Sequence, residues 1–141
     1  MQRPAFHLAI PVRDLAEARE FYVDLLGCGV GRTNERWLDF DLRGHQLSVH
    51  LAQDTEHAPP TNRVDGHDVP ARHFGLILDW DEWETLSRRL EEAGTEFLIP
   101  PTLRFRGRTG EQGTFFLLDP SGNAIEVKGF RDPDELFRSD D

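Results

Sequence analysis

The sequence predicts an α+β fold made of two paired copies of one module, each with the order strand–helix–strand–strand–strand. An alternating apolar segment followed by an amphipathic helix occurs near the start of the chain and again near its middle. Matching residues keep nearly constant spacing: His7 and His73 are 66 positions apart, Asp14 and Asp81 are 67 apart, and Gly27 and Gly94 are 67 apart. One module is too small to close a core, so we expect the two to form a cupped mixed sheet around a cavity.

Each module is expected to begin with a strand that carries a histidine at its start. Side chains alternate between the two faces of a strand, so His7 and His73 lie opposite the apolar positions of their strands. Those positions are Phe6, Leu8 and Ile10 in the first strand and Phe74, Leu76 and Leu78 in the second.

An amphipathic helix is expected to follow each of these strands. The first is predicted from an N-cap at Asp14 to a glycine stop at Gly27, with Glu17 as the capping-box partner. The second is predicted from a cap at Asp81 to a stop at Gly94. Each helix must cover the apolar face of its own sheet.

The rest of the chain divides into strands, a linker and a tail. Further strands are expected at residues 28–33, 36–42 and 46–51 of the first module and at 96–99, 113–118 and 123–130 of the second. Residues 1–141 are thus predicted to be one domain, with module one at about 5–52, a linker or lid at 53–72, module two at about 73–130 and an acidic tail at 131–141. The second module carries an extra loop at 100–112, and the tail a short surface helix at 133–138.

The charge and composition of the chain disfavour several classes of partner and indicate a cellular location. Sixteen Lys and Arg against 26 Asp and Glu give a net charge of −10, which disfavours nucleic acid and anionic membranes as partners. No apolar run approaches the ~18–20 residues that span a bilayer, and the Met1-Gln2-Arg3-Pro4 start does not resemble a signal peptide. Cys28 is the single cysteine, so no internal disulfide can form. We therefore expect a cytoplasmic protein.

The alternation of side chains along the strands puts three candidate metal ligands on the sheet face opposite the helices. With the apolar residues covered by the helices, His7 and His73 turn to the opposite, concave face. In the last strand Ile125 and Val127 face the helix, which leaves Glu126 on the concave side. A lone carboxylate in an apolar strand is costly to bury unless it is paired or bound to a metal. Two imidazoles and one carboxylate suit a divalent metal, with Fe(II) favoured and Mn, Ni or Zn as alternatives.

Several segments carry a family resemblance: residues 6–12 with Asp14-Leu15 and Phe21-Tyr22, then His73-Phe74-Gly75-Leu76, and Asp119-Pro120-Ser121-Gly122-Asn123-Ala124-Ile125-Glu126. On these, residues 5–130 resemble the vicinal-oxygen-chelate superfamily of glyoxalase I, extradiol dioxygenases, fosfomycin-resistance enzymes and bleomycin-resistance proteins. The resemblance implies paired βαβββ modules around a metal cavity, with His7, His73 and Glu126 as ligands. It also implies a small oxygenated substrate, and a homodimer is the expected assembly.

The reaction stays open at this point. Many glyoxalases have a fourth ligand where this chain has Ser48, which is a poor metal ligand. Ring-cleaving dioxygenases usually place a tyrosine beside the metal, and the single tyrosine here, Tyr22, lies on the predicted buried stripe of the first helix. A dioxygenase-like oxidoreductase is favoured. The alternatives are a glyoxalase- or fosfomycin-type lyase or transferase, and a bleomycin-resistance-like protein that binds a drug or metabolite without chemistry.

Other side chains are candidates for substrate contact. His50 shares the concave parity and could act as an acid–base group, because imidazole titrates near neutral pH. Ser48 has the same parity. Trp37 and Phe115 occupy matching places in the two modules and could wall the cavity, although core packing is the favoured interpretation for both. Arg106 lies in an arginine-rich loop that could clamp an anionic substrate, since guanidinium pairs with carboxylate or phosphate in two-point contacts. The alternative for that loop is a solvated surface.

Overall fold

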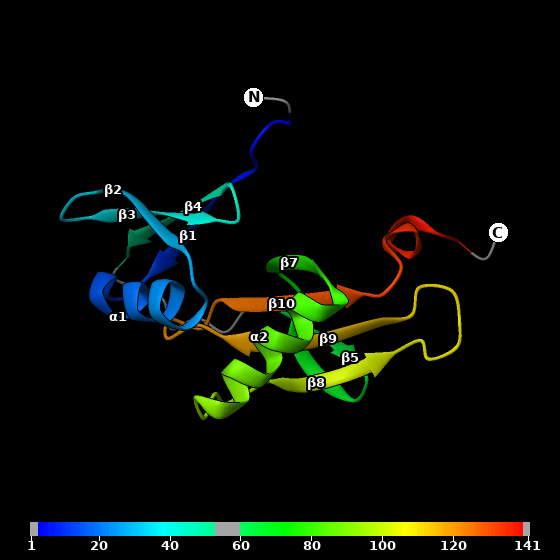
Figure 1. The fold of residues 1–141 in the computed structure, drawn as a ribbon. Helices are drawn as coiled ribbons and strands as arrows, with labels where there is room; N and C mark the ends of the chain where they lie inside the picture. Colours follow the sequence, from blue (N-terminus) through cyan, green and yellow to red (C-terminus); the bar gives the residue numbers. More distant parts are fainter. Residues whose placement is uncertain (1–2, 53–59, 140–141) are drawn as a thin grey trace. The chain divides into compact units, whose positions relative to one another are not determined.

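The computed structural model describes residues 3–52 and 60–139, which form two compact units (Figure 1). The N-terminal unit comprises Met1–Ala58 with Asp119–Asn123, and the C-terminal unit comprises Pro59–Leu118 with Ala124–Asp141. Each unit has one four-stranded mixed sheet, ordered β1-β4-β3-β2 in the first and β7-β10-β9-β8 in the second. The strand orders correspond position by position, which confirms the α+β fold with two βαβββ modules.

The elements follow the expected order. The N-terminal unit contains β1 (His7–Val12), α1 (Leu15–Arg19), the π-helix η1 (Glu20–Leu25), β2 (Gly29–Thr33), β3 (Trp37–Leu42) and β4 (His45–Leu51). The C-terminal unit contains β5 (Thr61–Val64), β6 (His67–Pro70), β7 (His73–Asp79), α2 (Trp80–Glu92), β8 (Ile99–Arg104), β9 (Gln112–Leu118), β10 (Ala124–Phe130) and the 3-10 helix η2 (Pro133–Phe137).

Two segments differ from the sequence prediction. The strand expected at 96–99 begins only at Ile99 and continues to Arg104, through two prolines that an edge strand tolerates because one side of it needs no donors. The expected linker contains the antiparallel hairpin β5–β6, in which Thr61 pairs with Pro70. The part of that linker at 53–59 lies outside the described residues.

The helix caps are only partly as predicted. Asp14 caps α1, its Oδ1 accepting a hydrogen bond of 2.8 Å from the Glu17 amide. The Glu17 carboxylate does not close the capping box but accepts two hydrogen bonds from Arg13, 2.6 and 2.9 Å long. The second helix begins at Trp80, so the prediction of Asp81 as its cap is wrong. Asp81 lies in the first turn, where a negative charge still favours the helix dipole.

The first strand buries the predicted face, except at its start. Leu8 and Ile10 are half-buried and Val12 is fully buried, whereas the alternate residues of β1 are exposed. Phe6 was expected on the buried face, yet it is 63% exposed. It lies just before the strand, and its amide donates to His45 Nδ1 at 2.9 Å.

The turn Asp119–Asn123 serves as a structural clip within the N-terminal unit. Tyr22 is fully buried and donates a 2.8 Å hydrogen bond to Asp119 Oδ2. Asn123 Nδ2 donates to the same carboxylate oxygen and to the Pro11 carbonyl, both at 2.8 Å. Burial, followed by the neighbouring Asp119 charge, raises the pKa of Tyr22 far above its ordinary value. The phenol therefore remains a donor at every physiological pH.

Helix α2 is attached to its sheet by Trp83. The Trp83 ring fills the space above two glycines, and a Cβ at Gly113 or Gly129 would lie 2.7 or 2.5 Å from its atoms. Its Nε1 donates to the Val127 carbonyl at 3.0 Å. This contact fixes which face of the second sheet is covered by the helix, and so which face is left for other contacts.

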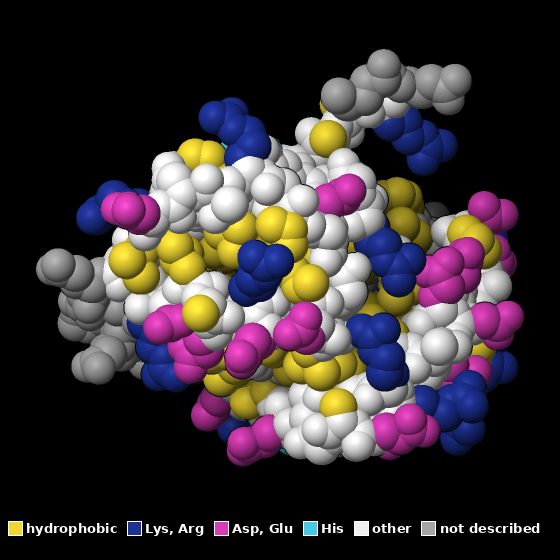
Figure 2. Space-filling model, turned by 60° about the vertical axis from the view of Figure 1, so that its left-hand side comes forward, with side chains coloured by type: hydrophobic (Ala, Val, Ile, Leu, Met, Phe, Trp, Pro, Cys, Tyr) yellow, Lys and Arg dark blue, Asp and Glu magenta, His cyan; other side chains and the backbone are white. Residues whose placement is uncertain are grey.

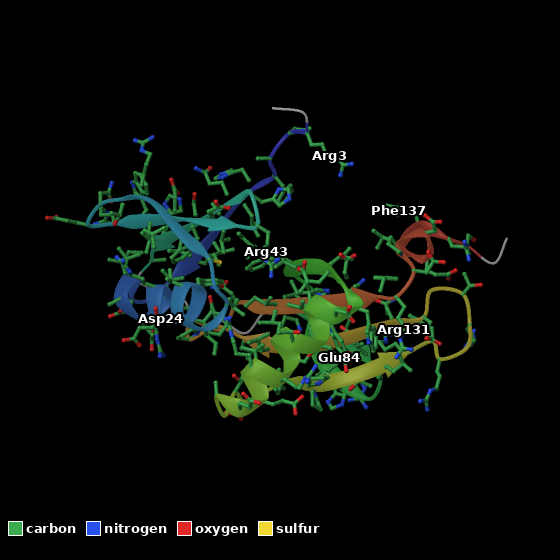
Figure 3. The ribbon with its side chains drawn as sticks, viewed as in Figure 1. Arg3, Asp24, Arg43, Glu84, Arg131 and Phe137 are labelled. Carbon is green, nitrogen blue, oxygen red and sulfur yellow. The ribbon has the colours of Figure 1, made fainter. Side chains whose placement is uncertain are left out.

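The surface is mixed in charge, and one face of it is shown in Figure 2. Arg131, labelled in Figure 3, lies over the Trp80 ring with its guanidinium carbon 4.2 Å from the ring centroid. Phe137 on η2 is 91% exposed. Cys28 is buried, and burial raises the pKa of its thiol to about 11. Among residues 3–52 and 60–139, none of the helices combines the length and apolar character needed to cross a bilayer.

Tyr22→Phe should lower the free energy of unfolding by about 1–2 kcal/mol, because it leaves a buried carboxylate with one donor fewer. Urea denaturation of Tyr22→Phe, Asp119→Asn and the double variant measures the loss and the coupling between the two side chains. If the losses of unfolding free energy in the two single variants add up to the loss in the double variant, the hydrogen bond contributes nothing to stability and Tyr22 and Asp119 do not act as a clip.

Candidate metal centre

The helix-free face of the C-terminal sheet brings two of the predicted ligands together. Glu126 on β10 lies opposite Gly75 on β7 and Phe116 on β9. His73 precedes Gly75 by two positions on β7, so it shares that face. Since Trp83 covers the other side of the sheet, the predicted parity of both residues is confirmed in this unit.

Glu126 is buried and its two carboxylate oxygens have different surroundings. The residue is 7% exposed in the middle of a buried strand. Its Oε2 accepts a hydrogen bond of 2.6 Å from the hydroxyl of Thr114. Its Oε1 lies 3.5 Å from His73 Nε2 and 3.9 Å from the Lys128 ammonium. One oxygen is therefore held by a neutral donor, and the other faces nitrogen groups across a wider gap.

The partners of His73 indicate which ring nitrogen is free. His73 Nδ1 lies 3.0 Å from the Pro70 carbonyl oxygen, which can only accept a hydrogen bond. In the neutral ring this contact puts the proton on Nδ1 and the lone pair on Nε2, an assignment inferred from the partners. The Nε2 lone pair and Glu126 Oε1 then face each other at 3.5 Å. Two acceptors in that arrangement fit a cation bound by both, with the Pro70 carbonyl orienting the imidazole.

The third predicted ligand belongs to the other unit. His7 is exposed at the start of β1, and it lies opposite Gln46 on the helix-free face of the N-terminal sheet. Within the described part of the chain, no group of three His, Cys, Asp or Glu side chains could hold a metal ion. The pair His73–Glu126 is thus brought together by the fold, and the completion of the site by His7 stays a prediction.

Besides Glu126 and Asp119, the carboxylate of Asp39 is buried, and the sequence analysis missed it. Asp39 on β3 is 9% exposed and lies opposite Ser48. It accepts a 2.5 Å hydrogen bond from the Ser48 hydroxyl and a 3.2 Å hydrogen bond from Gln46 Nε2. The signal was present, because the alternation Trp37-Leu38-Asp39-Phe40 puts Asp39 on the helix-free face. Ser48, predicted to contact substrate, is engaged with this carboxylate.

His50 and Trp37 are neighbours on that same face. They lie directly opposite each other on β4 and β3. His50 is exposed, whereas Trp37 is half-buried with the Arg32 guanidinium 5.6 Å from its ring centroid. Both positions agree with the predicted parity, and their roles in acid–base chemistry and substrate contact stay predictions.

Phe115 is not a wall of the cavity. It is fully buried on the helix side of its sheet, stacked on Trp83 and edge-on to Phe97. Core packing, the favoured interpretation for Phe115, is therefore confirmed, and Phe116 is the β9 residue that lies opposite Glu126. Phe116 also packs edge-on against His73, with ring centroids 5.1 Å apart.

The arginine-rich segment divides between a strand and a loop. Arg104 ends β8 and forms a 2.8 Å ion pair with Asp65, in the turn of the β5–β6 hairpin. Arg106 lies exposed in the loop between β8 and β9, where its predicted role in binding an anionic substrate is untested. Arg104 is thus paired with Asp65, and the predicted contact with an anionic substrate stays a prediction for Arg106.

The geometry can be compared with known proteins. Residues 5–127 match the model of the glyoxalase/bleomycin resistance protein/dioxygenase superfamily. The chain belongs to this superfamily. It is 35% identical to a glyoxalase/bleomycin resistance protein/dioxygenase from Alicyclobacillus acidocaldarius whose crystal structure superposes with a TM-score of 0.78, covering 96% of this chain and 97% of that one.

Two further known proteins are similar to this chain. The chain is 27% identical over 124 residues to the glutathione transferase FosA of Serratia marcescens. The matched segment covers 86% of this chain and 77% of FosA. The fosfomycin resistance protein FosX of Listeria monocytogenes shares the fold with a TM-score of 0.70 at 14% identity, covering 97% of this chain and all of that one. The superfamily contains enzymes, so an enzymatic function is plausible for this chain.

The approach of β7 to β10 beside the pair requires a glycine. A Cβ at Gly75 would lie 1.5 Å from the Glu126 carbonyl oxygen. Gly75→Ala should therefore push the two strands apart, lower the free energy of unfolding by about 1–3 kcal/mol, and displace Glu126. Gly31→Ala is the matched control, since its Cβ would meet neighbours at an ordinary 3.4 Å. Urea denaturation compares the two, and equal stabilities would contradict the close approach.

Proposed function

We propose that this protein is a metal-dependent enzyme that acts on a small organic molecule with two neighbouring oxygen atoms. The single observation that supports this most is the facing of His73 Nε2 and Glu126 Oε1 on the helix-free side of the sheet. His7 is proposed as the third ligand. A divalent metal bound by these residues would supply Lewis acidity to the substrate oxygens.

The chain's own residues would orient the substrate and move protons. Lys128 lies beside Glu126 with its side chain 34% exposed, so its ammonium can pair with an anionic group of the substrate. Arg106 is the proposed second cation for such a group. His50 is proposed as the acid–base group, since it is exposed on the helix-free face of its sheet. Trp37 would contact the apolar part of the substrate.

A lyase or transferase reaction has the better support. The FosA relative is described as a glutathione transferase, and by that likeness we propose addition of a nucleophile to the substrate. The dioxygenase-like reaction that the sequence analysis favours has less support, because Tyr22 is buried and donates to Asp119. No second tyrosine exists in the chain to stand beside a metal. Fe(II), Mn, Ni and Zn all suit the donor set.

Alanine substitution of each proposed ligand should abolish stoichiometric metal binding and leave the protein folded, because lost ligation matters more here than lost packing. The variants are His7→Ala, His73→Ala and Glu126→Ala, and His45→Ala is a matched control because its Nδ1 accepts from a backbone amide. Metal content of protein purified without chelator or nickel affinity, together with circular dichroism, gives the answer. Full metal occupancy in any two of the three variants would exclude the site.

The reaction class is tested with the metal-loaded protein. We expect loss of a hemithioacetal, or glutathione consumption with an epoxide that carries a phosphonate group. Oxygen uptake with a panel of catechols would instead establish the dioxygenase-like reaction. Stoichiometric binding of a ligand with no turnover in any assay would favour a binding protein. The homodimer and the cytoplasmic location also stay predictions, and light scattering measures the first.

His50→Gln should keep the metal and most of the substrate affinity but lower kcat by ~10²–10⁴-fold, the usual contribution of a positioned acid or base. His67→Gln, on the β5–β6 hairpin, is the matched control. Steady-state kinetics over a range of pH gives both parameters. Wild-type turnover would assign His50 to structure, and loss of the metal would make it a ligand.

A further inference from the structure

The β5–β6 hairpin lies against the same face of the C-terminal sheet as His73 and Glu126. Val69 on β6 is fully buried in an apolar cluster with Ile99 of β8 and Phe116 of β9. Val64 on β5 packs against the same cluster. Because Phe116 lies opposite Glu126, the hairpin covers the sheet directly beside the candidate metal ligands.

Two contacts connect the hairpin to His73, and a third anchors the turn of the hairpin to β8. The Pro70 carbonyl, at the end of β6, receives the contact from His73 Nδ1 at 3.0 Å. Phe116, on which Val69 packs, holds the His73 ring edge-on. At the far end of the hairpin, Asp65 is tied to Arg104 of β8 by an ion pair of 2.8 Å. The hairpin is thus held at its turn and by the packing of Val69, and its last residue, Pro70, contacts the imidazole.

We propose that the β5–β6 hairpin is a positioning element for His73, which selects its Nδ1-protonated tautomer and aims Nε2 at Glu126. This inference rests on the proposed metal site and deepens it. A carbonyl partner orients a ligating imidazole and fixes its tautomer, and losing such a partner usually weakens metal binding 10–100-fold. Val69 and the Asp65–Arg104 pair act through Pro70, so they are positioning residues and not ligands.

The first test removes the ion pair without changing the turn. Asp65 has a positive φ of 47°, a conformation that asparagine also adopts readily. Asp65→Asn should therefore keep the hairpin turn but lose the charge, and weaken Mn²⁺ binding in calorimetry by about fivefold, the upper range for a part-exposed ion pair. Asp68→Asn is the matched control, because it makes the same charge change in the same hairpin. Its pair with Arg63 at 3.3 Å has both side chains exposed, and its Mn²⁺ affinity should stay at the wild-type value.

The second test removes packing. Val69→Ala should weaken Mn²⁺ binding by about tenfold or more. Val49→Ala makes the same truncation at a fully buried strand position of the N-terminal unit and should leave the affinity unchanged at a comparable loss of stability. Equal Mn²⁺ affinity of Val69→Ala and Val49→Ala would overturn the proposal.

A readout without metal separates this inference from the proposed function. The ¹⁵N chemical shifts of the His73 ring, recorded in alkaline solution where a free imidazole is neutral, report the tautomer directly. Wild-type protein should show the Nδ1-protonated form, and Val69→Ala a mixture in which the Nε2-protonated form gains. Failure of the wild type to bind Mn²⁺ would overturn the metal site, while the tautomer still tests the hairpin. An unchanged tautomer in Val69→Ala would overturn the hairpin proposal even where Mn²⁺ binds.

Discussion

Burial of the Glu126 carboxylate is the constraint on which the candidate site depends. A charged group inside a strand of otherwise buried residues requires compensation, and the structure provides it unequally. The Thr114 hydroxyl satisfies one oxygen at 2.6 Å, whereas the other oxygen faces His73 and Lys128 at 3.5 and 3.9 Å. Those distances are too long for strong hydrogen bonds. The second oxygen is therefore the one available to a bound cation, and everything proposed about function starts from it.

Glycines allow close packing on both faces of the sheet around Glu126. Gly75 lets β7 approach β10 so closely that a side chain there would meet the Glu126 carbonyl. On the opposite side of the sheet, Trp83 occupies the space above Gly113 and Gly129. Gly75 thus allows β7 to approach β10, and Gly113 and Gly129 allow Trp83 of α2 to approach the sheet. A Cβ at any of the three positions would lie too close to these neighbours. The helix is held to one face, which leaves the other face to Glu126, His73 and the hairpin.

The turn from Asp119 to Asn123 shows how a family motif can be structural. Its residues belong to the N-terminal unit, where Asp119 accepts hydrogen bonds from Tyr22 and Asn123. The motif that carries most of the sequence resemblance thus secures the fold of that unit, and the glutamate that follows it, Glu126, is a proposed metal ligand. Tyr22 is engaged in this clip, so we propose no role for it beside a metal.

The sequence by itself determined the duplicated module, most strand positions and the face on which His73 and Glu126 lie. These follow from the alternation of side chains along a strand and from the constant spacing between matching residues of the two modules. Alternation alone could not assign a face to Phe115, because two adjacent phenylalanines offer no pattern to follow, and its place in the core was decided by the fit of Trp83 over the glycines. Alternation already puts Asp39 on the helix-free face, but only the tertiary structure shows that its carboxylate is buried and accepts hydrogen bonds from Ser48 and Gln46 of the neighbouring strand. The hairpin at 61–70 was also beyond the sequence analysis. Most of its residues are polar, and its two strands are too short to show a clear alternation. The hairpin is held by the packing of Val69 on Phe116 and by the ion pair of Asp65 with Arg104, which are contacts between segments about 40 residues apart.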